Sequence, residues 1–275
     1  MNLKEAYEYA KQNKIETNQT RILLKYILKD KFNLYLAETL LSIEEETYFK
    51  NYINQLKGGK PIQYITHEQY FYGEKFYVDA NVLIPQPDTE IIVNEAIKQI
   101  QNIKKKNIKI LDLCTGSGAI AISILKCENE QRKKQHNVQM YASDISKEAI
   151  NIAYKNEENI LKEHTIKFIQ SDMFENIDKK FDIIVSNPPY IRKDVIKTLP
   201  IDVQKEPHIA LDGGNDGLKY YRIIEKNYKE YLNDKGIILL EIGYDQKEEV
   251  QELFKNSICI KDFAGNDRVI MLQLQ

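Results

Sequence analysis

The first 57 residues carry hydrophobic side chains at the spacing of amphipathic helices, without any alternation of strand length. The apolar faces of the first two predicted helices contain Leu3, Ala6, Tyr7 and Ala10, then Ile22, Leu23, Tyr26 and Ile27. We expect Thr17 or Asn18 to cap the second helix, and Ser42 to cap a third helix over residues 44–56. This pattern predicts a small helical bundle.

Residues 62–84 are instead rich in Tyr, Phe, Val and Ile, with Gly73 near the middle. This composition, between a Gly-Gly-Lys-Pro run and a pair of prolines, predicts a β-hairpin. Asp88 or Thr89 is then expected to cap a helix that ends near Ile100.

From residue 108 onward, apolar runs of strand length alternate with helical segments. The predicted strands cover 108–113, 138–143, 166–170, 181–186 and 236–242, and the predicted helices cover 119–127, 146–162, 217–232 and 246–256. Segments 257–263 and 268–274 are expected to pair antiparallel, and the charged stretch from Cys127 to Asn137 to form a solvated helix end and loop. The alternation predicts an α/β fold whose parallel sheet binds a ligand at the carboxyl ends of its strands.

These patterns divide the 275 residues into a helical domain over 1–60, a β-hairpin linker over 61–87 and an α/β domain over 88–275. A net charge of −2 and an isoelectric point of about 6.2 disfavour stable binding to nucleic acid. Three cysteines without a C-x-x-C pair and four scattered histidines indicate neither a disulfide framework nor a metal site. The chain has no apolar run of membrane-spanning length and no signal peptide, so we expect a cytoplasmic location.

The segment ILDLCTGSG joins the first predicted strand of the α/β domain to a helix. Gly116 and Gly118 would let the backbone approach a ligand, because glycine has no Cβ. Neither the phosphate-loop pattern G-x-x-x-x-G-K-[ST] nor the dinucleotide pattern G-x-G-x-x-G is present. The segment therefore predicts a ligand-binding loop of another kind, with a tight structural turn as the alternative.

Acidic residues follow the next two predicted strands. Asp144 can accept hydrogen bonds from both hydroxyls of a ribose. Asp172 could accept from an adenine amino group, and Met173 could pack on the ring. The alternative for both aspartates is a helix cap.

The fourth predicted strand ends in Ser186-Asn187-Pro188-Pro189-Tyr190. Two prolines make a stiff backbone without N–H donors. The Pro188 carbonyl and the Asn187 amide can then accept both protons of a planar NH2 group, and Tyr190 offers it a flat face. The alternative is a Pro-Pro turn with no chemical role.

This motif resembles that of amino methyltransferases acting on adenine, cytosine, guanine or glutamine amides. Over almost the whole chain, the sequence is similar to the protein-(glutamine-N5) methyltransferases of peptide chain release factors, the PrmC/HemK family. The matching segments are GKPIQYI at 59–65, FYG at 71–73, VLIPQPDTE at 82–90, DLCTGSG at 112–118, SNPPYI at 186–191, EPHIALDGGNDGLKYYR at 206–222, LEIGYDQ at 240–246 and DFAGNDRVI at 262–270.

The resemblance implies a class I S-adenosylmethionine-dependent methyltransferase with a Rossmann-like, seven-stranded mixed sheet. It implies S-adenosylmethionine as cofactor, S-adenosylhomocysteine as product, and as substrate the glutamine in the GGQ motif of class 1 release factors, which the helical domain would dock. The residues implied to bind the cofactor are Cys114, Thr115, Gly116, Ser117, Gly118, Asp144, Asp172, Met173 and Asn187. The substrate would contact Asn187, Pro188, Pro189 and Tyr190, of which Asn187, Pro188 and Tyr190 would be catalytic.

Three positions depart from the family pattern. Gln86 replaces an arginine and removes a charge, and Met173 stands where an aromatic residue is common. Cys114 stands where glycine is common, and a small side chain is tolerated there if its φ is negative.

Three other functions remain open at this point. A glutamine methyltransferase of a ribosomal protein shares the catalytic motif, although the amino-terminal matches and the 206–214 segment favour the release factor. An N6-adenine DNA methyltransferase would flip its base into the same pocket, but it would need a basic cleft. A catalytically idle scaffold that binds translation factors would not need Asp144 and Asn187. We expect a monomer that works without a metal and has no membrane partner.

Overall fold

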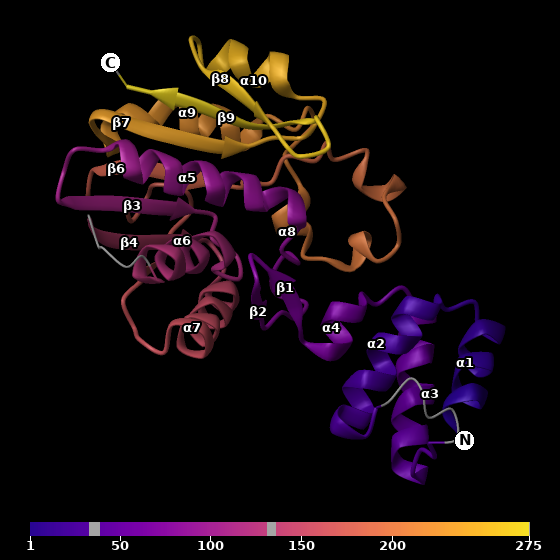
Figure 1. Cartoon of the computed structure of the whole chain (residues 1–275). Helices are drawn as coiled ribbons and strands as arrows, with labels where there is room; N and C mark the ends of the chain where they lie inside the picture. Colours follow the sequence, from indigo (N-terminus) through magenta and orange to yellow (C-terminus); the bar gives the residue numbers. More distant parts are fainter. Residues whose placement is uncertain (33–38, 131–135, 275) are drawn as a thin grey trace. The chain divides into compact units, whose positions relative to one another are not determined.

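The computed structural model describes residues 1–32, 39–130 and 136–274. Residues 131–135 of the charged stretch after Cys127 thus lie outside the described residues. The chain forms two compact units, one made of Met1–Glu68 with Pro200–Lys205, and the other of Gln69–Leu199 with Glu206–Gln275 (Figure 1).

The first unit is helical, as its periodicity predicts. Its elements are α1 (Leu3–Gln12), α2 (Thr17–Leu28), η1 (Lys29–Lys31), α3 (Ile43–Lys57), α4 (Ile62–Thr66) and η4 (Val203–Lys205). The predicted cap at Ser42 is confirmed, because its side chain accepts from the Glu45 N–H in a capping box. The predicted cap at Thr17 or Asn18 is wrong, because both residues already lie in the first turn of α2.

The predicted hairpin is present but shorter than expected. Its strands are β1 (Gln69–Phe71) and β2 (Glu74–Phe76), which pair antiparallel on either side of Gly73. The prediction is wrong for Ile62–Thr66, which form a helical turn after Pro61. The proline explains this difference, because its fixed φ suits the start of a helix. The apolar residues that follow it can be buried by a short helical turn as well as by a strand.

The second unit contains a seven-stranded mixed sheet of order β5-β4-β3-β6-β7-β9-β8. The strands are β3 (Asn107–Leu113), β4 (Asn137–Asp144), β5 (Lys167–Gln170), β6 (Phe181–Ser186), β7 (Leu232–Glu241), β8 (Ile258–Lys261) and β9 (Asp267–Gln273). The strands from β3 to β7 pair parallel, and β9 pairs antiparallel with both β7 and β8. The predicted parallel sheet with an antiparallel edge is therefore confirmed.

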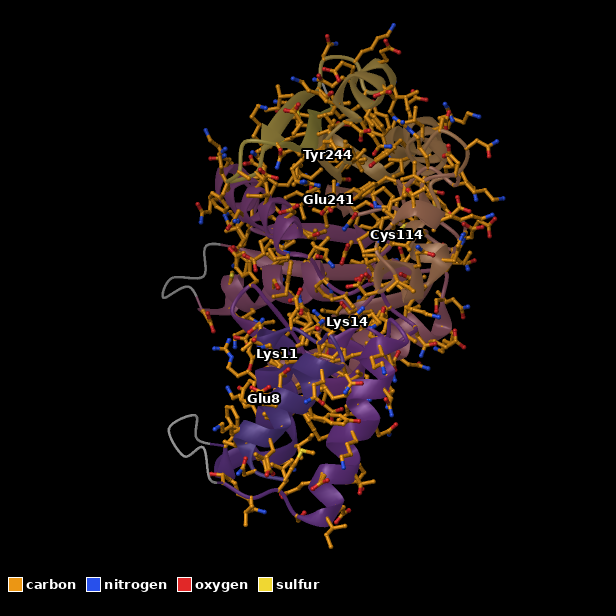
Figure 2. All side chains as sticks on the ribbon, turned by 90° about the vertical axis from the view of Figure 1, so that its right-hand side faces the viewer. Glu8, Lys11, Lys14, Cys114, Glu241 and Tyr244 are labelled. Carbon is orange, nitrogen blue, oxygen red and sulfur yellow. The ribbon has the colours of Figure 1, made fainter. Side chains whose placement is uncertain are left out.

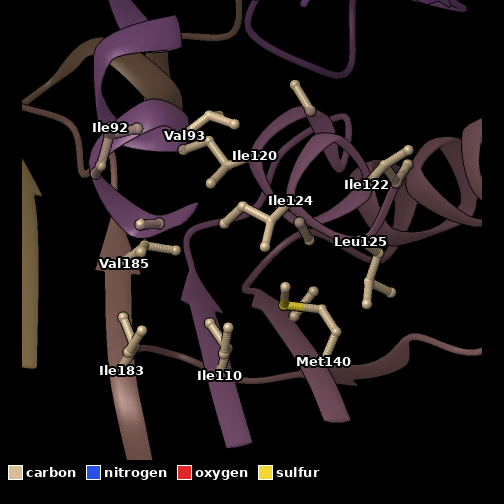
Figure 3. Packing of buried hydrophobic residues seen from close by; sticks show 14 of the residues in the cluster. Ile92, Val93, Ile110, Ile120, Ile122, Ile124, Leu125, Met140, Ile183 and Val185 are labelled. Atoms are coloured by element: carbon tan, nitrogen blue, oxygen red, sulfur yellow. The ribbon is translucent and has the colours of Figure 1, made fainter. Parts of the chain in front are cut away.

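Helices cover both faces of this sheet (Figure 1). The described helices of this unit are η2 (Pro87–Thr89), α5 (Glu90–Asn102), α6 (Ala119–Glu130), α7 (Lys147–Leu161), η3 (Ile196–Thr198), α8 (His208–Leu211), α9 (Lys219–Tyr231) and α10 (Lys247–Leu253), of which α5, α6, α7, α9 and α10 pack on the sheet. On one face, Ile92 and Ile124 from α5 and α6 pack over Ile110 of β3 (Figure 3). Leu111 faces the opposite way, because side chains alternate along a strand, and joins the core beneath α9 and α10.

The direction in which strands are added to the sheet reverses between β3 and β6. Chain order runs from β3 outward through β4 to β5, and then returns to β6 on the other side of β3. The loops that leave β3 and β6 therefore diverge, and ligands of α/β sheets bind in the crevice between such loops. Among the described residues, no helix has the length and apolar character needed to cross a membrane.

Candidate active site

A cavity of about 980 Å³, partly open to solvent, lies at the carboxyl ends of the central strands. The residues expected at the site that line it are Cys114, Thr115, Gly116, Ser117, Asp144, Asp172, Met173, Asn187 and Pro189. Gly118, Pro188 and Tyr190 do not contribute to its wall. The structure thus brings the glycine loop, two acidic strand ends and the Asn-Pro-Pro turn to one place.

The loop after β3 is shaped by a buried carboxyl. Asp112 accepts a hydrogen bond from the Thr115 hydroxyl at 2.6 Å and one from the Ala121 N–H at 3.2 Å. Burial raises the pKa of Asp112 to about 7, and these two donors oppose the shift. The loop is also joined to β4, because the Thr115 N–H donates to the Ser143 carbonyl at 2.9 Å. These hydrogen bonds therefore fix the loop to the helix that follows it and to β4.

The two glycines of the loop have different roles. Gly116 has a φ of 55°, and a Cβ built on it would meet nothing within 4 Å, so its backbone faces open space at the cavity. A Cβ on Gly118 would lie 2.9 Å from Ile122 and 3.1 Å from Ala153. Gly118 thus permits close packing of α6 against α7, which corrects the expectation that it lets the backbone approach a ligand.

Cys114, whose side chain is labelled in Figure 2, adopts a left-handed conformation with a φ of 65°, so the condition of a negative φ is not met. The turn from β3 into the glycine loop requires this conformation, which glycine adopts without strain. Met173 is also left-handed, with a φ of 48°, and its sulfur lies 3.8 Å from that of Cys114. Two non-glycine residues in this conformation thus meet at the cavity wall.

The two aspartates after β4 and β5 do not cap helices. Ser146 is the N-cap of α7, and Asp144 instead accepts from the Gly116 N–H at 2.8 Å and the Ser146 N–H at 2.9 Å. Asp172 is followed by a turn, and its side chain is exposed at the rim of the cavity. Burial raises the pKa of Asp144, and the backbone donors oppose that shift. Asp144 thus ties the glycine loop to the end of β4 and faces the cavity.

The Asn-Pro-Pro-Tyr turn is anchored to neighbouring strands. The Ser186 hydroxyl donates to the Leu113 carbonyl at 2.6 Å, which joins β6 to β3 where the turn begins. The Asn187 Nδ2 donates to the Thr89 hydroxyl at 3.3 Å. The Tyr190 hydroxyl donates to Glu241 at 3.5 Å and so points toward the end of β7. The Tyr190 ring packs against the core cluster beneath α9.

The segment Asp212–Gly217 packs directly on the backbone of Tyr190. The Gly213 N–H donates to the Ile191 carbonyl at 2.8 Å, and a Cβ on Gly213 would lie 2.7 Å from two backbone atoms of Tyr190. A Cβ on Gly217 would lie 2.5 Å from the Tyr190 carbonyl oxygen. These glycines allow two backbone segments to touch, which gives the DGGNDG sequence a steric role.

Several residues of the site were not predicted from their pattern. Thr89 was expected to be a helix cap, but it makes no capping hydrogen bond and lines the cavity. Glu206 accepts from the Ile84 N–H at 2.8 Å and so joins the two segments that form the rim. The further wall residues Gln86, Pro207, Ile209, Ala210 and Tyr220 lie in loops or near helix ends. Only the family resemblance pointed to these segments, since no periodicity marks them.

The sheet order and the cavity above β3 and β6 are those expected of a class I S-adenosylmethionine-dependent methyltransferase, and the comparisons with known proteins show that the chain belongs to this class. The family model described as methyltransferase small domain matches residues 95–201 of this chain. A methyltransferase structure from Pyrococcus furiosus has a TM-score of 0.51 at 16% identity, covering 82% of this chain and 98% of that one. A 16S rRNA N2 G1207 methyltransferase of T. thermophilus has a TM-score of 0.53 at 15% identity, covering 76% and 50%. These two likenesses show the fold.

Full-length relatives narrow the class to one family. The release factor glutamine methyltransferase of Clostridium acetobutylicum is 40% identical, covering 97% of this chain and 95% of its own. That of Clostridium botulinum is 42% identical with the same coverage, and that of Thermodesulfovibrio yellowstonii is 38% identical over 95% and 94%. This chain belongs to the release factor glutamine methyltransferases.

Proposed function

We propose that this enzyme transfers the methyl group of S-adenosylmethionine to the side-chain amide nitrogen (N5) of the glutamine in the GGQ motif of class 1 release factors. One observation carries the proposal. Asn187 of the proline turn lines the same cavity as Gly116 and Asp144. A donor held on the glycine loop and an NH2 group held on the turn would therefore meet in one cavity.

The residues of the cavity fit S-adenosylmethionine. The bare backbone at Gly116 leaves space for the methionine part, to which Cys114 and Thr115 are adjacent. The Asp144 carboxylate would accept from the ribose hydroxyls, and Asp172 and Met173 would contact the adenine. When bound, S-adenosylmethionine supplies an electrophilic methyl group on a sulfonium.

The glutamine amide would be held by oxygen acceptors of the turn. An NH2 group has two protons, and the Asn187 side-chain oxygen and the Pro188 carbonyl could accept one each. The prolines at 188 and 189 contribute no N–H that could compete. The same acceptors favour the positive charge that develops on nitrogen as it is methylated. The amide nitrogen is a poor nucleophile, so alignment is the main contribution, and in favourable cases alignment supplies roughly 7–11 kcal/mol.

The helical unit is proposed to dock the release factor. Its described residues include the exposed hydrophobic side chains of Leu40, Ile43 and Tyr48, which lie close together in the sequence, from just before α3 to its second turn. Exposed apolar side chains close together are typical of a protein interaction surface. We propose a helical docking domain over 1–60, a linker over 61–87 and a catalytic domain over 88–275. A release-factor substrate would place the enzyme in the cytoplasm.

The test is methylation of purified substrates by the full chain. Mass spectrometry should find one added methyl group on the glutamine of a class 1 release factor, and none when that glutamine is replaced by alanine. Ribosomal proteins and duplex DNA serve as competing substrates. A preference for either of them would contradict the proposal, and cofactor binding without any methylation would support a scaffold instead.

A further inference from the structure

A buried side-chain amide is bound to the end of the Asn-Pro-Pro-Tyr turn. Gln246 directly precedes α10 and is only 3% exposed. Its Nε2 donates to the Tyr190 carbonyl at 3.0 Å and to the Gly217 carbonyl at 3.4 Å. Its Oε1 accepts from the Gly243 N–H at 3.0 Å. One amide thus joins the turn, the DGGNDG segment and the loop after β7.

The three partners fix the orientation of this amide. The Gly243 N–H can only donate, and the Tyr190 and Gly217 carbonyls can only accept. A flipped Gln246 would place its NH2 against an N–H and its oxygen against two carbonyl oxygens. Because the amide is buried, such unpaired groups would be costly. The Gln246 side chain is therefore held in one orientation, with its protons toward the turn.

Two glycines leave the space that the amide occupies. A Cβ built on Gly217 would lie 2.6 Å from the Gln246 Nε2, and one built on Gly243 would lie 2.9 Å from its Oε1. Both distances are shorter than van der Waals contact, so a side chain at either position would displace the amide. The backbone around Gln246 therefore accommodates its amide closely, and the hydrogen bond to Tyr190 is part of a packed arrangement.

The prolines make the turn dependent on anchors from outside. Pro188 and Pro189 have no N–H, so this part of the backbone cannot donate the hydrogen bonds that usually fix a loop. The Ser186 hydroxyl joins the start of the turn to β3. Gln246 joins its end, three residues after Asn187. The two proposed oxygen acceptors thus lie between two anchored points.

We propose that Gln246 is a positioning residue, which fixes the end of the turn and thereby orients the acceptors of Asn187 and Pro188 toward the substrate amide. This inference rests on the proposed function, because it assigns those acceptors to a glutamine amide. Gln246 itself does not contribute to the wall of the cavity, so it touches neither substrate nor cofactor in this role. Its loss should lower kcat and leave cofactor binding intact.

The kinetic test compares the full chain with Gln246→Met, with a release factor as substrate. Methionine has a similar length but removes both donors and the acceptor. We expect kcat to fall at least about tenfold, since small misplacements at a reacting centre are that costly. The affinity for S-adenosylhomocysteine, measured by calorimetry, should stay within about twofold, because the glycine loop is not anchored by this residue.

The matched control is Gln251→Met on α10. The Gln251 Nε2 also donates to a backbone carbonyl, that of Ser257 at 2.8 Å, but this hydrogen bond lies outside the turn. The control should keep the wild-type kcat. A wild-type kcat in Gln246→Met, or equal losses of kcat and cofactor affinity in that variant, would overturn the proposal.

Gln246→Glu is a milder second variant. It keeps the shape and the acceptor for the Gly243 N–H, but it loses at least one of the two donors. Its kcat should lie between those of Gln246→Met and the wild type. Should Gln246→Met fail to fold, a wild-type kcat in Gln246→Glu overturns the proposal in its place.

A measurement without substrate distinguishes this inference from the proposed function. Ser186-Asn187 is the only Ser-Asn pair in the sequence. Enzyme labelled with 13C-carbonyl serine and 15N-asparagine therefore gives one carbonyl-coupled signal, that of the Asn187 N–H. We expect this signal to move in Gln246→Met and to stay in place in Gln251→Met. If it does so while no release factor is methylated, the positioning role stands and the substrate assignment fails. If it stays in place in Gln246→Met, the positioning role is wrong whatever the substrate.

Discussion

Gly213 lies against Tyr190 so closely that a Cβ built on the glycine would be 2.7 Å from both the Tyr190 Cα and its carbonyl carbon. Both of these are backbone atoms, so they cannot move aside as a flexible side chain would. The position of the Asn-Pro-Pro-Tyr turn therefore depends on a residue without a side chain in a distant loop.

Gly213→Ala should displace the turn. We expect it to lower the free energy of unfolding by about 1–3 kcal/mol, as overpacking does, and to reduce kcat as well. Urea unfolding and methylation kinetics measure the two effects. The control is Gly58→Ala, where the nearest atom to an added Cβ lies 3.3 Å away. A Gly213→Ala enzyme as active and stable as the control would contradict the steric role.

Asn187→Ala should lose turnover and keep cofactor affinity. The side chain is proposed to bind the substrate amide, so kcat should fall about 10²- to 10³-fold, as when one stabilising hydrogen bond to a transition state is removed. Asp144→Ala is the converse variant and should weaken cofactor binding more than it lowers kcat. Steady-state kinetics and calorimetry distinguish the two. Equal losses of kcat and affinity in Asn187→Ala would argue against its assigned role.

Cys114→Gly should stabilise the protein, because Cys114 has a φ of 65° that glycine adopts freely. Glycine loses more backbone entropy on folding than cysteine does, which offsets part of this gain. We therefore expect the free energy of unfolding in urea to rise by about 0.5–1 kcal/mol. The same substitution at Cys127 in helix α6 should instead lower stability by about 1 kcal/mol. Destabilisation by both variants would show that the left-handed cysteine is not strained.

The stability of the protein should fall as the pH rises from about 5 to about 8. Burial raises the pKa of Asp112 from 3.8 to about 7, so the native state retains a proton that the unfolded chain has already released. The unfolded chain thus binds fewer protons in this window, and the free energy of unfolding decreases with pH. Glu241 contributes with the same sign.

Asp112→Asn removes one of these two groups. Between about pH 5 and about pH 8, this variant should lose less of its free energy of unfolding than the wild type does. The difference between the two losses should be at least about 1 kcal/mol, since one unit of pKa shift corresponds to 1.36 kcal/mol. Urea unfolding at each pH measures the difference. Parallel pH dependences in the two proteins would mean that Asp112 is ionised throughout.

The sequence patterns predicted nearly every element of the sheet and its helices, because apolar periodicity is a local property and each element buries one face or two. The order of the motifs along the chain was also enough to place Asn187 and Asp144 at one edge, since parallel strands end together. Two predictions were wrong. Ile62–Thr66 form a helical turn after Pro61 instead of part of a strand, and neither Thr17 nor Asn18 caps α2.

The polar residues behind the site could not be predicted from local patterns. Thr89 follows a proline and precedes a helix, so its sequence context is that of a cap, and its partner Asn187 is 98 residues away. Glu241 ends an apolar strand, and only the packing of α9 and β9 shows that it is buried. The φ of Cys114 depends on the angle between β3 and the glycine loop, which composition does not reveal.

The placement of β6 beside β3 has a consequence for synthesis on the ribosome. A nascent chain that ends between Met173 and Phe181 already contains Gly116, Asp144 and Met173, yet it lacks β6 and the Asn187 that follows this strand. Domains form from the amino-terminal side during translation, so Gly116 and Asp144, which are proposed to bind the donor, emerge before Asn187, which is proposed to bind the acceptor. Fragments that end before Asn187 should therefore lack methylating capacity.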